Sequence, residues 1–342
     1  MKKLLIFTDT YNEQLNGVTR CIDNLCANLP RNIQVTIVSS DEFVSIPFLG
    51  YKEIRLSFAF PRRIQKRIRE IQPDYIHIMT EGPIGLTAAY VCKRKKIPYT
   101  TTFHTKFPEY LHMRNRLVKE EYVHQYLHYI HDGAEQIFIS NDGLHQYLEE
   151  NGYERRIVVP FGIDHSVFFP GEKTLFRDIP TPILLFVGRI AVEKNIGDFL
   201  DMNAKYQKVV VGDGPLYQKY KEEYPDVLFL GKKSPKELGE IYRSVDAFVF
   251  PSKTDTLGLV NLEAMASGLP IIAYDIENTR GVIEDGKTGI LVPEGQKLES
   301  AIPKIPNIHP QDSIDFVKDF TWENYAQKFI SHQFPISKNL WI

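Results

Sequence analysis

Short apolar runs alternate with helix-patterned stretches along the whole of this 342-residue chain. This order is typical of α/β proteins with parallel sheets, in which a crossover helix joins each strand to the next. The runs fall into two series, and we predict one doubly wound parallel sheet from each. The first series is Leu4–Thr8, Val35–Ser39, Tyr75–Met79, Tyr99–Phe103, Gln136–Ser140 and Ile157–Pro160. The second is Ile183–Gly188, Lys208–Gly212, Val227–Gly231, Ala247–Pro251, Ile271–Tyr274 and Gly289–Val292.

A stretch rich in glycine and proline separates the two series. It runs from Gly162 to Gly171 and is followed by Pro180 and Pro182, which is typical of a hinge or linker. We therefore predict one domain over residues 1–165 and a second over 166–324. Doubly wound sheets bind ligands at the carboxyl ends of their strands, so two facing sheets would have a ligand cleft between them.

Composition restricts the function classes. The chain is 43% hydrophobic and 25% charged, and its formal net charge of −2 gives no reason to expect a nucleic-acid partner. Its three cysteines, Cys21, Cys26 and Cys92, lack Cys-x-x-Cys spacing, so we expect small buried thiols in a reducing cytoplasm. The first apolar run is too short for a signal peptide or a membrane span, and we expect a cytoplasmic protein.

The most specific pattern lies between Lys253 and Pro270. Asp255 stands eight positions before Glu263, across a loop that enters a helix. A helix N-terminus presents unpaired backbone N–H groups and the positive end of the helix dipole, both of which favour phosphate. The alternative is an alanine-rich helix that packs against a sheet, with Glu263 simply exposed. The backbone groups that we predict to bind phosphate are those of Leu257, Gly258, Leu259 and Val260.

A second phosphate signal follows the first strand of the second series. Arg189 and Lys194 lie five residues apart on the loop after that strand. Arginine is a two-pronged donor and lysine a point charge, and together they can neutralise a diphosphate. A solvated turn is the alternative. Gly212 and Gly214 follow the next strand and permit close backbone approach, so we include them as candidates for the same site.

These runs resemble the motifs of family 4 glycosyltransferases. Asp255 to Glu263 is similar to the acidic-x7-acidic signature of that family, in which most members have glutamate at the first position. Gly188–Asn195 is similar to the family's Gly-Arg-x4-Lys-Asn motif. The run Thr-Asp-Thr-Leu-Gly-Leu-Val, at 254–260, resembles the branch that contains lipid- and mannosyl-type enzymes.

The resemblance implies the GT-B fold, with two Rossmann-like domains facing each other across a cleft. It implies that a last helix, within about residues 325–342, crosses back to the first domain. It also implies transfer with retention and without a metal ion. In that reaction Arg189 and Lys194 would stabilise the leaving diphosphate, while Asp255 would hold the hexose and Glu263 the ribose.

Two features of the first domain take their meaning from the same resemblance. Gly17 resembles the glycine of a loop that touches donor phosphate and sugar in this family, with Asn16 in the place of a second glycine. His104 matches the family's His-Thr element and implies a catalytic side chain near the sugar C1. The downstream Phe-Pro-x-Tyr, at 107–110, is similar to the lipid- and mannosyl-type branch.

One group of histidines has a spacing that suits zinc. His124, His128 and His131 stand four and three positions apart on a predicted helix. We favour a structural role, because tyrosines alternate with them and the resemblance implies a metal-independent reaction. The sequence also lacks an Asp-x-Asp triplet for Mg²⁺. We expect no metal and no cofactor, with the nucleotide sugar as a substrate.

The basic segment 52–69 is the main clue to the acceptor. Its basic residues are opposed within the segment only by Glu53, and Phe60, Ile64 and Ile68 fall at helical spacing. A basic amphipathic segment of this kind can bind an anionic membrane surface. The alternative is that the isoleucines pack on the sheet beneath a solvated basic face. The basic residues are Lys52, Arg55, Arg62, Arg63, Lys66, Arg67 and Arg69.

From these residues we predict retaining transfer of a hexose from a UDP- or GDP-sugar to a hydroxyl acceptor. The expected acceptor is a membrane lipid, such as diacylglycerol or a phospholipid, at the inner face of the membrane. Three alternatives stay open. One is another reaction on the same fold, such as epimerisation or inverting transfer. Another is a soluble glycan, small molecule or protein as the acceptor. The third is a sugar-nucleotide-binding module without turnover.

Overall fold

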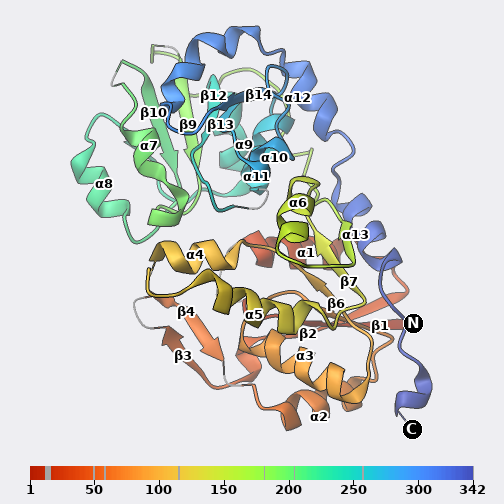
Figure 1. Ribbon diagram of the computed structural model, residues 1–342. Coiled ribbons are helices and arrows are strands. Elements are labelled where there is room, and N and C mark those ends of the chain that lie inside the picture. Colours follow the sequence, from red (N-terminus) through yellow and green to blue (C-terminus); the bar gives the residue numbers. More distant parts are fainter. Residues whose placement is uncertain are drawn as a thin grey trace. The chain divides into compact units, whose positions relative to one another are not determined.

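The chain folds into two compact units (Figure 1). The computed structural model describes residues 1–11, 17–48, 51–57, 59–114, 116–180, 182–203, 205–255 and 258–341. Unit 1 consists of Met1–Phe161 together with Trp322–Ile342, and unit 2 consists of Gly162–Thr321. The boundaries predicted from the sequence lie a few residues further along the chain.

Unit 1 is built on a six-stranded parallel sheet. The strand order is β2-β1-β5-β6-β7-β8, so the order reverses between β1 and β5. All the strands of the first predicted series are present. Strands β1, β5 and β7 are mainly apolar and buried, whereas β2 and β8 are largely half-buried and β6 is a buried run of three threonines. Their bounds are β1 Lys2–Phe7, β2 Ile33–Val38, β5 Tyr75–Ile78, β6 Thr100–Thr102, β7 Gln136–Ile139 and β8 Arg156–Val158.

Helices connect these strands and cover the sheet. Both α2 and α3 begin with proline, whose missing N–H is not needed in the first turn, and end at a left-handed residue, Gln72 and Lys96 respectively. These two helices form one apolar core with Phe7, whereas α5 and α6 form another with Phe103. The bounds are α1 Gly17–Asn28, α2 Pro61–Ile71, α3 Pro83–Lys95, α4 Phe107–Arg114, α5 Glu120–His131 and α6 Gly143–Glu150.

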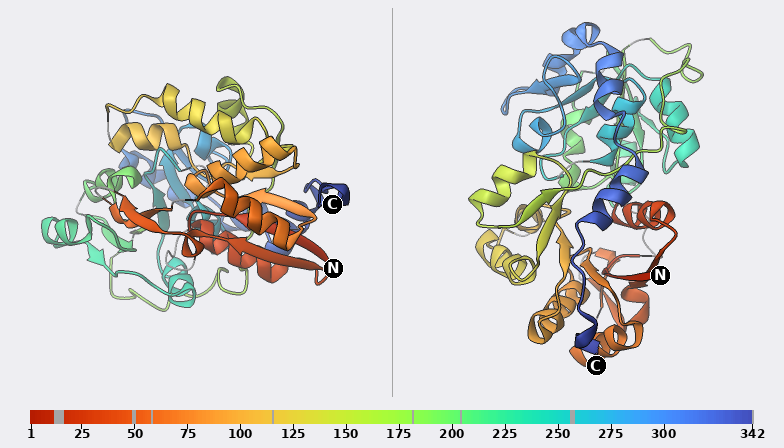
Figure 2. Two further views of the ribbon diagram at one scale, coloured as in Figure 1. Left: turned by 90° about the horizontal axis from the view of Figure 1, so that it is seen from below. Right: turned by 90° about the vertical axis from the view of Figure 1, so that its right-hand side faces the viewer.

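The C-terminal segment packs back onto unit 1 (Figures 1 and 2). Helix α13, Trp322–Ser331, lies against α1. Beyond it, the Gln333 side chain accepts a hydrogen bond of 2.8 Å from the Thr100 hydroxyl, a residue 233 positions earlier. Ile336 is buried in the core under α2 and α3, and its N–H donates to the Asp74 carbonyl at 2.9 Å.

Unit 2 contains the second six-stranded parallel sheet, in the order β11-β10-β9-β12-β13-β14. This order reverses between β9 and β12, as in a Rossmann sheet. The second predicted series is also present in full. The strand bounds are β9 Ile183–Val187, β10 Gln207–Val211, β11 Leu228–Phe229, β12 Ala247–Phe250, β13 Ile271–Tyr274 and β14 Gly289–Val292. The helices are α7 Ile196–Leu200, α8 Tyr217–Glu223, α9 Pro235–Arg243, α10 Leu259–Ala266, α11 Glu277–Arg280 and α12 Pro310–Val317.

A short hairpin in unit 1 corrects the prediction for segment 52–69. The antiparallel strands β3, Ser45–Phe48, and β4, Tyr51–Ser57, precede α2. The basic segment is therefore a strand followed by a helix rather than one amphipathic element. The alternation of apolar Ile54 and Leu56 with Glu53 and Arg55 is the two-residue period of a strand, which outweighs a helical reading there.

Candidate functional site

The candidate donor site lies at the topological switch point of unit 2. Arg189 and Lys194 follow β9, and Asp255 follows β12. These two strands are parallel neighbours, so their carboxyl ends meet at the same edge of the sheet. Residues that stand more than sixty positions apart in the sequence therefore come from adjoining loops.

An ion pair joins these loops. Nζ of Lys194 donates to Oδ1 of Asp255, with the two side chains 26% and 22% exposed. Beside it, the Thr254 hydroxyl donates to the carbonyl of Glu193 at 3.2 Å. Asn195 adds a third link, through its amide nitrogen, to the backbone just after β12 at 3.2 Å. The structure thus brings two of the predicted site residues into direct contact and fixes the loops that carry them.

The two glycines of the next turn shape the Arg189 loop. Gly212 has a φ of +133°, and a Cβ there would lie 1.9 Å from the carbonyl oxygen of Gly188. A Cβ on Gly214 would lie 2.4 Å from the carbonyl oxygen of Ile190. The close approach that the sequence predicts is therefore present, but its partner within the chain is the backbone on both sides of Arg189. Contact of these glycines with a donor stays a prediction.

Helix α10 begins where the phosphate-binding turn was predicted. Gly258 is its N-cap, with a φ of +67°, and a Cβ at that position would lie 2.9 Å from the ring of Phe250. Only glycine meets both conditions without strain. The backbone N–H groups of Leu259 and Val260 belong to the first turn, where helices offer donors to anions. Leu257 lies outside the described residues.

Glu263 is buried inside α10. Its side chain is 2% exposed, and the Tyr242 hydroxyl donates to Oε2 at 3.3 Å and to the carbonyl of Val260 at 3.2 Å. The alternative of an exposed Glu263 is therefore wrong. Its neighbours from Leu262 to Ala266 are buried as well. A carboxylate in such an apolar helix is costly unless it has hydrogen-bond donors, as a ribose would supply.

The family of the chain follows from these motifs and from two family models. The model described as Glycosyltransferase Family 4 matches residues 15–167, and that described as Glycosyl transferases group 1 matches residues 181–305. The chain belongs to the family 4 glycosyltransferases. It is an enzyme of the glycosyl-transferring class, and its two Rossmann-like sheets are those of the GT-B fold.

Relatives of this glycosyltransferase include an alpha-monoglucosyldiacylglycerol synthase of Streptococcus pneumoniae. It is 26% identical, and the match covers 96% of this chain and 84% of that protein. A sulfoquinovosyl transferase of Arabidopsis thaliana is also 26% identical, over 87% of this chain but only 63% of its own length. The lipid-type branch indicated by the sequence motifs is thus represented among the relatives.

Solved structures agree on the fold of the glycosyltransferase. A sucrose-phosphate synthase from Thermosynechococcus elongatus has a TM-score of 0.77 at 18% identity, and covers 97% of this chain and 98% of its own. The Anabaena protein HepE, in complex with UDP, has a TM-score of 0.73 at 16% identity, over 97% and 99% of the two chains.

In unit 1 of the glycosyltransferase, His104 stands in an apolar setting. Its Nε2 lies 3.2 Å from Sδ of Met79, and its ring stacks on Phe161 with centroids 5.8 Å apart. Burial lowers the pKa of His104 to about 4, against a smaller opposing effect of the Glu81 charge. The imidazole is therefore neutral near pH 7 and can either donate or accept a hydrogen bond.

Two carboxylates at the same sheet edge were missed by the sequence reading. Glu81 follows β5, is 9% exposed and has Oε1 3.6 Å from Nε2 of His131. Asp9 follows β1 and accepts hydrogen bonds from the N–H of Ile84 at 2.7 Å and from the Thr80 hydroxyl at 2.9 Å. Because Ile84 lies in the first turn of α3, the Asp9 carboxylate caps the start of that helix. The signal that could have found them is their place at the ends of β1 and β5, where the order of this sheet reverses.

Gly17 is the exposed first residue of α1. A Cβ built on it would have nothing within 4 Å, in contrast to Gly212. Nothing within the described part of unit 1 therefore requires glycine at this position. Its predicted contact with the donor stays a prediction, and Asn16 lies outside the described residues.

The three histidines of α5 make polar contacts with other side chains of unit 1. No three His, Cys, Asp or Glu side chains of the described residues are placed to hold a metal ion together. Each histidine has a separate partner within unit 1, in line with the structural role that we favour. His124 contacts the Tyr153 hydroxyl at 3.1 Å, His128 contacts Asp132 at 3.0 Å, and His131 contacts the Thr101 hydroxyl at 2.9 Å.

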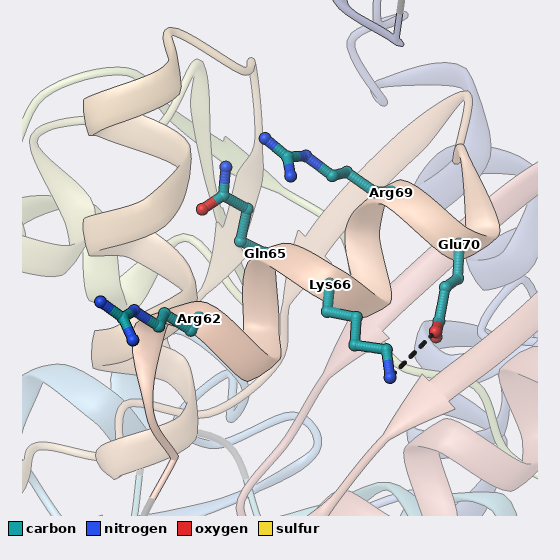
Figure 3. A pocket seen from close by; sticks show the side chains of 5 residues that line it. All are labelled: Arg62, Gln65, Lys66, Arg69 and Glu70. Carbon is teal, nitrogen blue, oxygen red and sulfur yellow. Dashed lines mark ion pairs between the residues drawn. The ribbon is translucent and has the colours of Figure 1, made fainter.

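Helix α2 presents a basic surface. Its isoleucines Ile64 and Ile68 are buried, as the packing alternative predicts, whereas Phe60, just before the helix, is 68% exposed. A surface pocket of about 440 Å³ lies over the helix, and Figure 3 shows Arg62 and Arg69 extending away from the ion pair beside them. The residues around this pocket are Arg62, Gln65, Lys66, Arg69 and Glu70.

Carboxylates oppose part of this basic surface. Lys66 lies 3.7 Å from Glu70, and Arg67 lies 2.9 Å from Glu42. Both acidic residues come from outside segment 52–69, within which Glu53 is the only acidic residue, so the fold adds counter-charges that the segment itself does not contain. No helix of the described chain is both long and apolar enough to cross a bilayer.

Proposed function

We propose that this glycosyltransferase moves a hexose from a UDP- or GDP-sugar to a hydroxyl group of a membrane lipid, with retention at the anomeric carbon. The Lys194–Asp255 ion pair beside the start of α10 carries the proposal. We assign the cation of this pair to the diphosphate and its carboxylate to the sugar hydroxyls. UDP is the nucleotide in the complex of the HepE structure.

Each donor residue then has a defined task. Lys194 has three N–H donors, so it can bind Asp255 and a phosphate oxygen together. Arg189 binds the diphosphate from the neighbouring turn, and the N–H groups of Leu259 and Val260 add fixed donors. Asp255 holds the hexose, and buried Glu263 holds the ribose. These cations and N–H groups stabilise the charge that develops as the diphosphate leaves.

The proposed step exchanges one bond for another at the sugar. The bond between C1 and the phosphate oxygen breaks while the acceptor oxygen bonds C1 on the same face. The acceptor proton moves to the departing phosphate oxygen. His104, as a neutral imidazole, is the candidate catalytic side chain of unit 1. We propose that no metal ion takes part, and transfer should continue unchanged in excess EDTA.

A lipid acceptor is supported by two observations. The Streptococcus pneumoniae relative is named for the synthesis of a glucosyldiacylglycerol, which is a lipid. In this chain, Arg62 and Arg69 line one surface pocket over α2, and Phe60, the residue before that helix, is exposed, a combination that suits an anionic lipid surface. We therefore propose that the enzyme works in the cytoplasm, at the inner face of the membrane.

The donor half is tested by calorimetry of the whole chain with UDP, GDP, UDP-glucose and GDP-mannose, followed by transfer assays to diacylglycerol in vesicles. We expect one nucleotide series to bind and the matching sugar to appear on lipid as the α-anomer. A β-anomeric product would overturn retention. Efficient transfer to soluble sugars with none to lipid would favour the soluble-acceptor alternative.

The membrane half is tested by co-sedimentation with anionic and neutral vesicles. Reversing two charges, Arg62→Glu with Arg69→Glu, should reduce binding to anionic vesicles roughly tenfold or more, since each basic residue near such a surface contributes about 1 kcal/mol. The matched control reverses two exposed lysines of unit 2, Lys304→Glu with Lys318→Glu. An equal loss of vesicle binding in both variants would show that binding depends on net charge alone and not on the surface of α2.

A further inference from the structure

Asn278 links a third loop to the candidate donor site. It lies on α11, after β13, the strand that pairs with β12 in the sheet. Its side chain is 3% exposed, and its amide nitrogen donates to the backbone carbonyl of Asp255 at 3.0 Å. Neither Asn278 nor its short helix belongs to any of the motifs that indicated the site.

This hydrogen bond fixes Asp255 from a second side. The carboxylate is held by Lys194, while the backbone carbonyl of the same residue is held by Asn278. A carboxylate on a loop can turn away from a ligand either by a side-chain rotation or by a movement of the backbone. The two contacts oppose these two movements separately, so Asn278 acts on the direction of the carboxylate through the loop.

Two buried polar atoms, on the segments that follow β12 and β13, have no protein partner within the described chain. They are Oδ1 of Asn278 and Oγ of Ser252, a residue that is 2% exposed and stands three positions before Asp255. Buried polar atoms are nearly always hydrogen-bonded, so each such atom calls for a partner. The two residues follow neighbouring strands at the edge of the sheet that carries Asp255. A sugar hydroxyl can donate a hydrogen bond to the amide oxygen of Asn278 and can exchange one with the hydroxyl of Ser252.

We propose that Asn278 is a positioning and specificity-determining residue for the donor hexose. Its amide nitrogen holds Asp255 in place, and its amide oxygen, together with the Ser252 hydroxyl, binds a hydroxyl group of the same sugar. The inference rests on the proposed function, because it assumes that Asp255 faces the hexose of a nucleotide sugar.

The experiment compares binding of the nucleotide with binding of the nucleotide sugar. Asn278→Asp keeps the shape of the side chain but replaces the N–H donor by an oxygen that repels the Asp255 carbonyl. Ser252→Ala removes one hydroxyl and leaves the link to Asp255 intact. The matched control is Asn307→Asp, the same substitution at an exposed position of unit 2. Calorimetry with UDP, GDP, UDP-glucose and GDP-mannose is combined with kcat, KM and melting temperatures.

We expect Asn278→Asp to lower kcat/KM roughly tenfold to a hundredfold, the range for a lost hydrogen bond that leaves a buried group unsatisfied. Affinity for the nucleotide alone should stay within about twofold, because the phosphate and ribose contacts are untouched. Ser252→Ala should show the same selective loss with a smaller size, and Asn307→Asp should show none.

Equal loss of nucleotide and nucleotide-sugar binding would overturn the proposal, since it would mean that Asn278 only supports the fold of unit 2. Wild-type kinetics in both Asn278→Asp and Ser252→Ala would overturn it as well. Failure of the proposed function has a different signature, because the unmodified enzyme would then bind no nucleotide and transfer no sugar.

Discussion

The two units differ in how they hold their candidate residues. In unit 2, Lys194 and Asp255 form an ion pair, and polar side chains link their loops. In unit 1, His104 is neutral and packs against Met79 and Phe161. Both sets stand at the carboxyl ends of parallel strands, so the fold is the same in kind and the chemistry is not.

Glycosyl transfer combines two tasks, stabilising the leaving diphosphate and binding the reacting hydroxyl, and the two sets of residues suit one task each. A leaving diphosphate carries charge, and it is best stabilised by cations and N–H groups held in place beforehand. A reacting hydroxyl is neutral, and a neutral imidazole in an apolar setting can bind it without the cost of burying a charge. We therefore expect substitution of Lys194 or Glu263 to affect nucleotide binding or charge stabilisation, and substitution of His104 to affect neither nucleotide affinity nor salt dependence.

The largest expected effect among the charged residues of unit 2 is that of Lys194→Ala. It removes a cation from the leaving group and leaves Asp255 without its ion-pair partner, so transfer should fall at least about 100-fold. Steady-state transfer rates at saturating donor measure the effect. Lys304→Ala, which removes an exposed lysine of the same unit, should leave the rate unchanged. Near-normal turnover in Lys194→Ala would contradict the assignment of the diphosphate site.

A pair of glycine substitutions separates backbone packing from ligand contact. Gly212→Ala forces a Cβ to within 1.9 Å of a carbonyl oxygen at a φ of +133°, so we expect a loss of about 2–4 kcal/mol in the free energy of unfolding. Gly17→Ala meets open space and should change that free energy by less than about 0.5 kcal/mol. Chemical denaturation measures both. A fall in transfer by Gly17→Ala without a loss of stability would support its predicted contact with the donor.

Glu263→Gln tests the ribose contact. The substitution keeps the shape of a buried side chain but removes its charge, and we expect affinity for the nucleoside diphosphate to fall roughly ten- to a hundredfold. Calorimetry with the nucleotide that binds the unmodified enzyme gives the answer. Tyr242→Phe removes the hydroxyl that contacts Glu263 at 3.3 Å and the Val260 carbonyl at 3.2 Å, and should cost about threefold or less. If the Tyr242 variant lost more affinity than the Glu263 variant, the carboxylate would not be the group that binds ribose.

The smallest expected effect is on the pH dependence of stability, through the neutral imidazole of His104 in unit 1. Burial lowers the pKa of His104 to about 4, so between pH 6.5 and 4 the unfolded chain binds a proton that the folded chain does not. The free energy of unfolding should therefore decrease as the pH falls through this window. Asp9 opposes the trend, because burial raises its pKa to about 6 and the folded state then binds the extra proton.

The measurement is urea unfolding at several pH values between 7 and 5. His104→Gln should show a shallower loss of stability than the unmodified chain, because the group that fails to protonate is gone. An identical slope in the two proteins would mean that His104 titrates normally. Transfer activity should not follow the titration of His104 above about pH 5, since the ring stays neutral there.

Most strands were predictable because they are short, mainly apolar runs between glycine or polar residues, although β6 consists of three threonines. The hairpin β3–β4 was not found, although Ile54 and Leu56 alternate with charged residues in the manner of a strand. There the nearby arginines and isoleucines, which do form α2, extended the helical reading too far toward the N-terminus. Local pattern decides the type of an element, but adjacent patterns with different periods obscure the point where one begins.

The site was predictable only in part, for a reason of distance along the chain. Motifs place Arg189, Lys194, Asp255 and Glu263 because each lies in a compact run of characteristic residues. The contact of Asn278 with Asp255 spans 23 positions and that of Thr254 with Glu193 spans 61. Such contacts depend on which strands are neighbours in the sheet, and a single sequence does not contain that information in any local run.

The return of the C-terminal segment to unit 1 affects the order in which the chain can fold during synthesis. Unit 2 is an uninterrupted stretch, Gly162–Thr321, and all of its strands leave the ribosome before α13. Unit 1 lacks α13 and the contacts of Gln333 and Ile336 until the last residues emerge. Unit 2 can therefore reach its native state before unit 1 has its final helix. Removal of residues from the C-terminal segment should destabilise unit 1, the unit that is synthesised first.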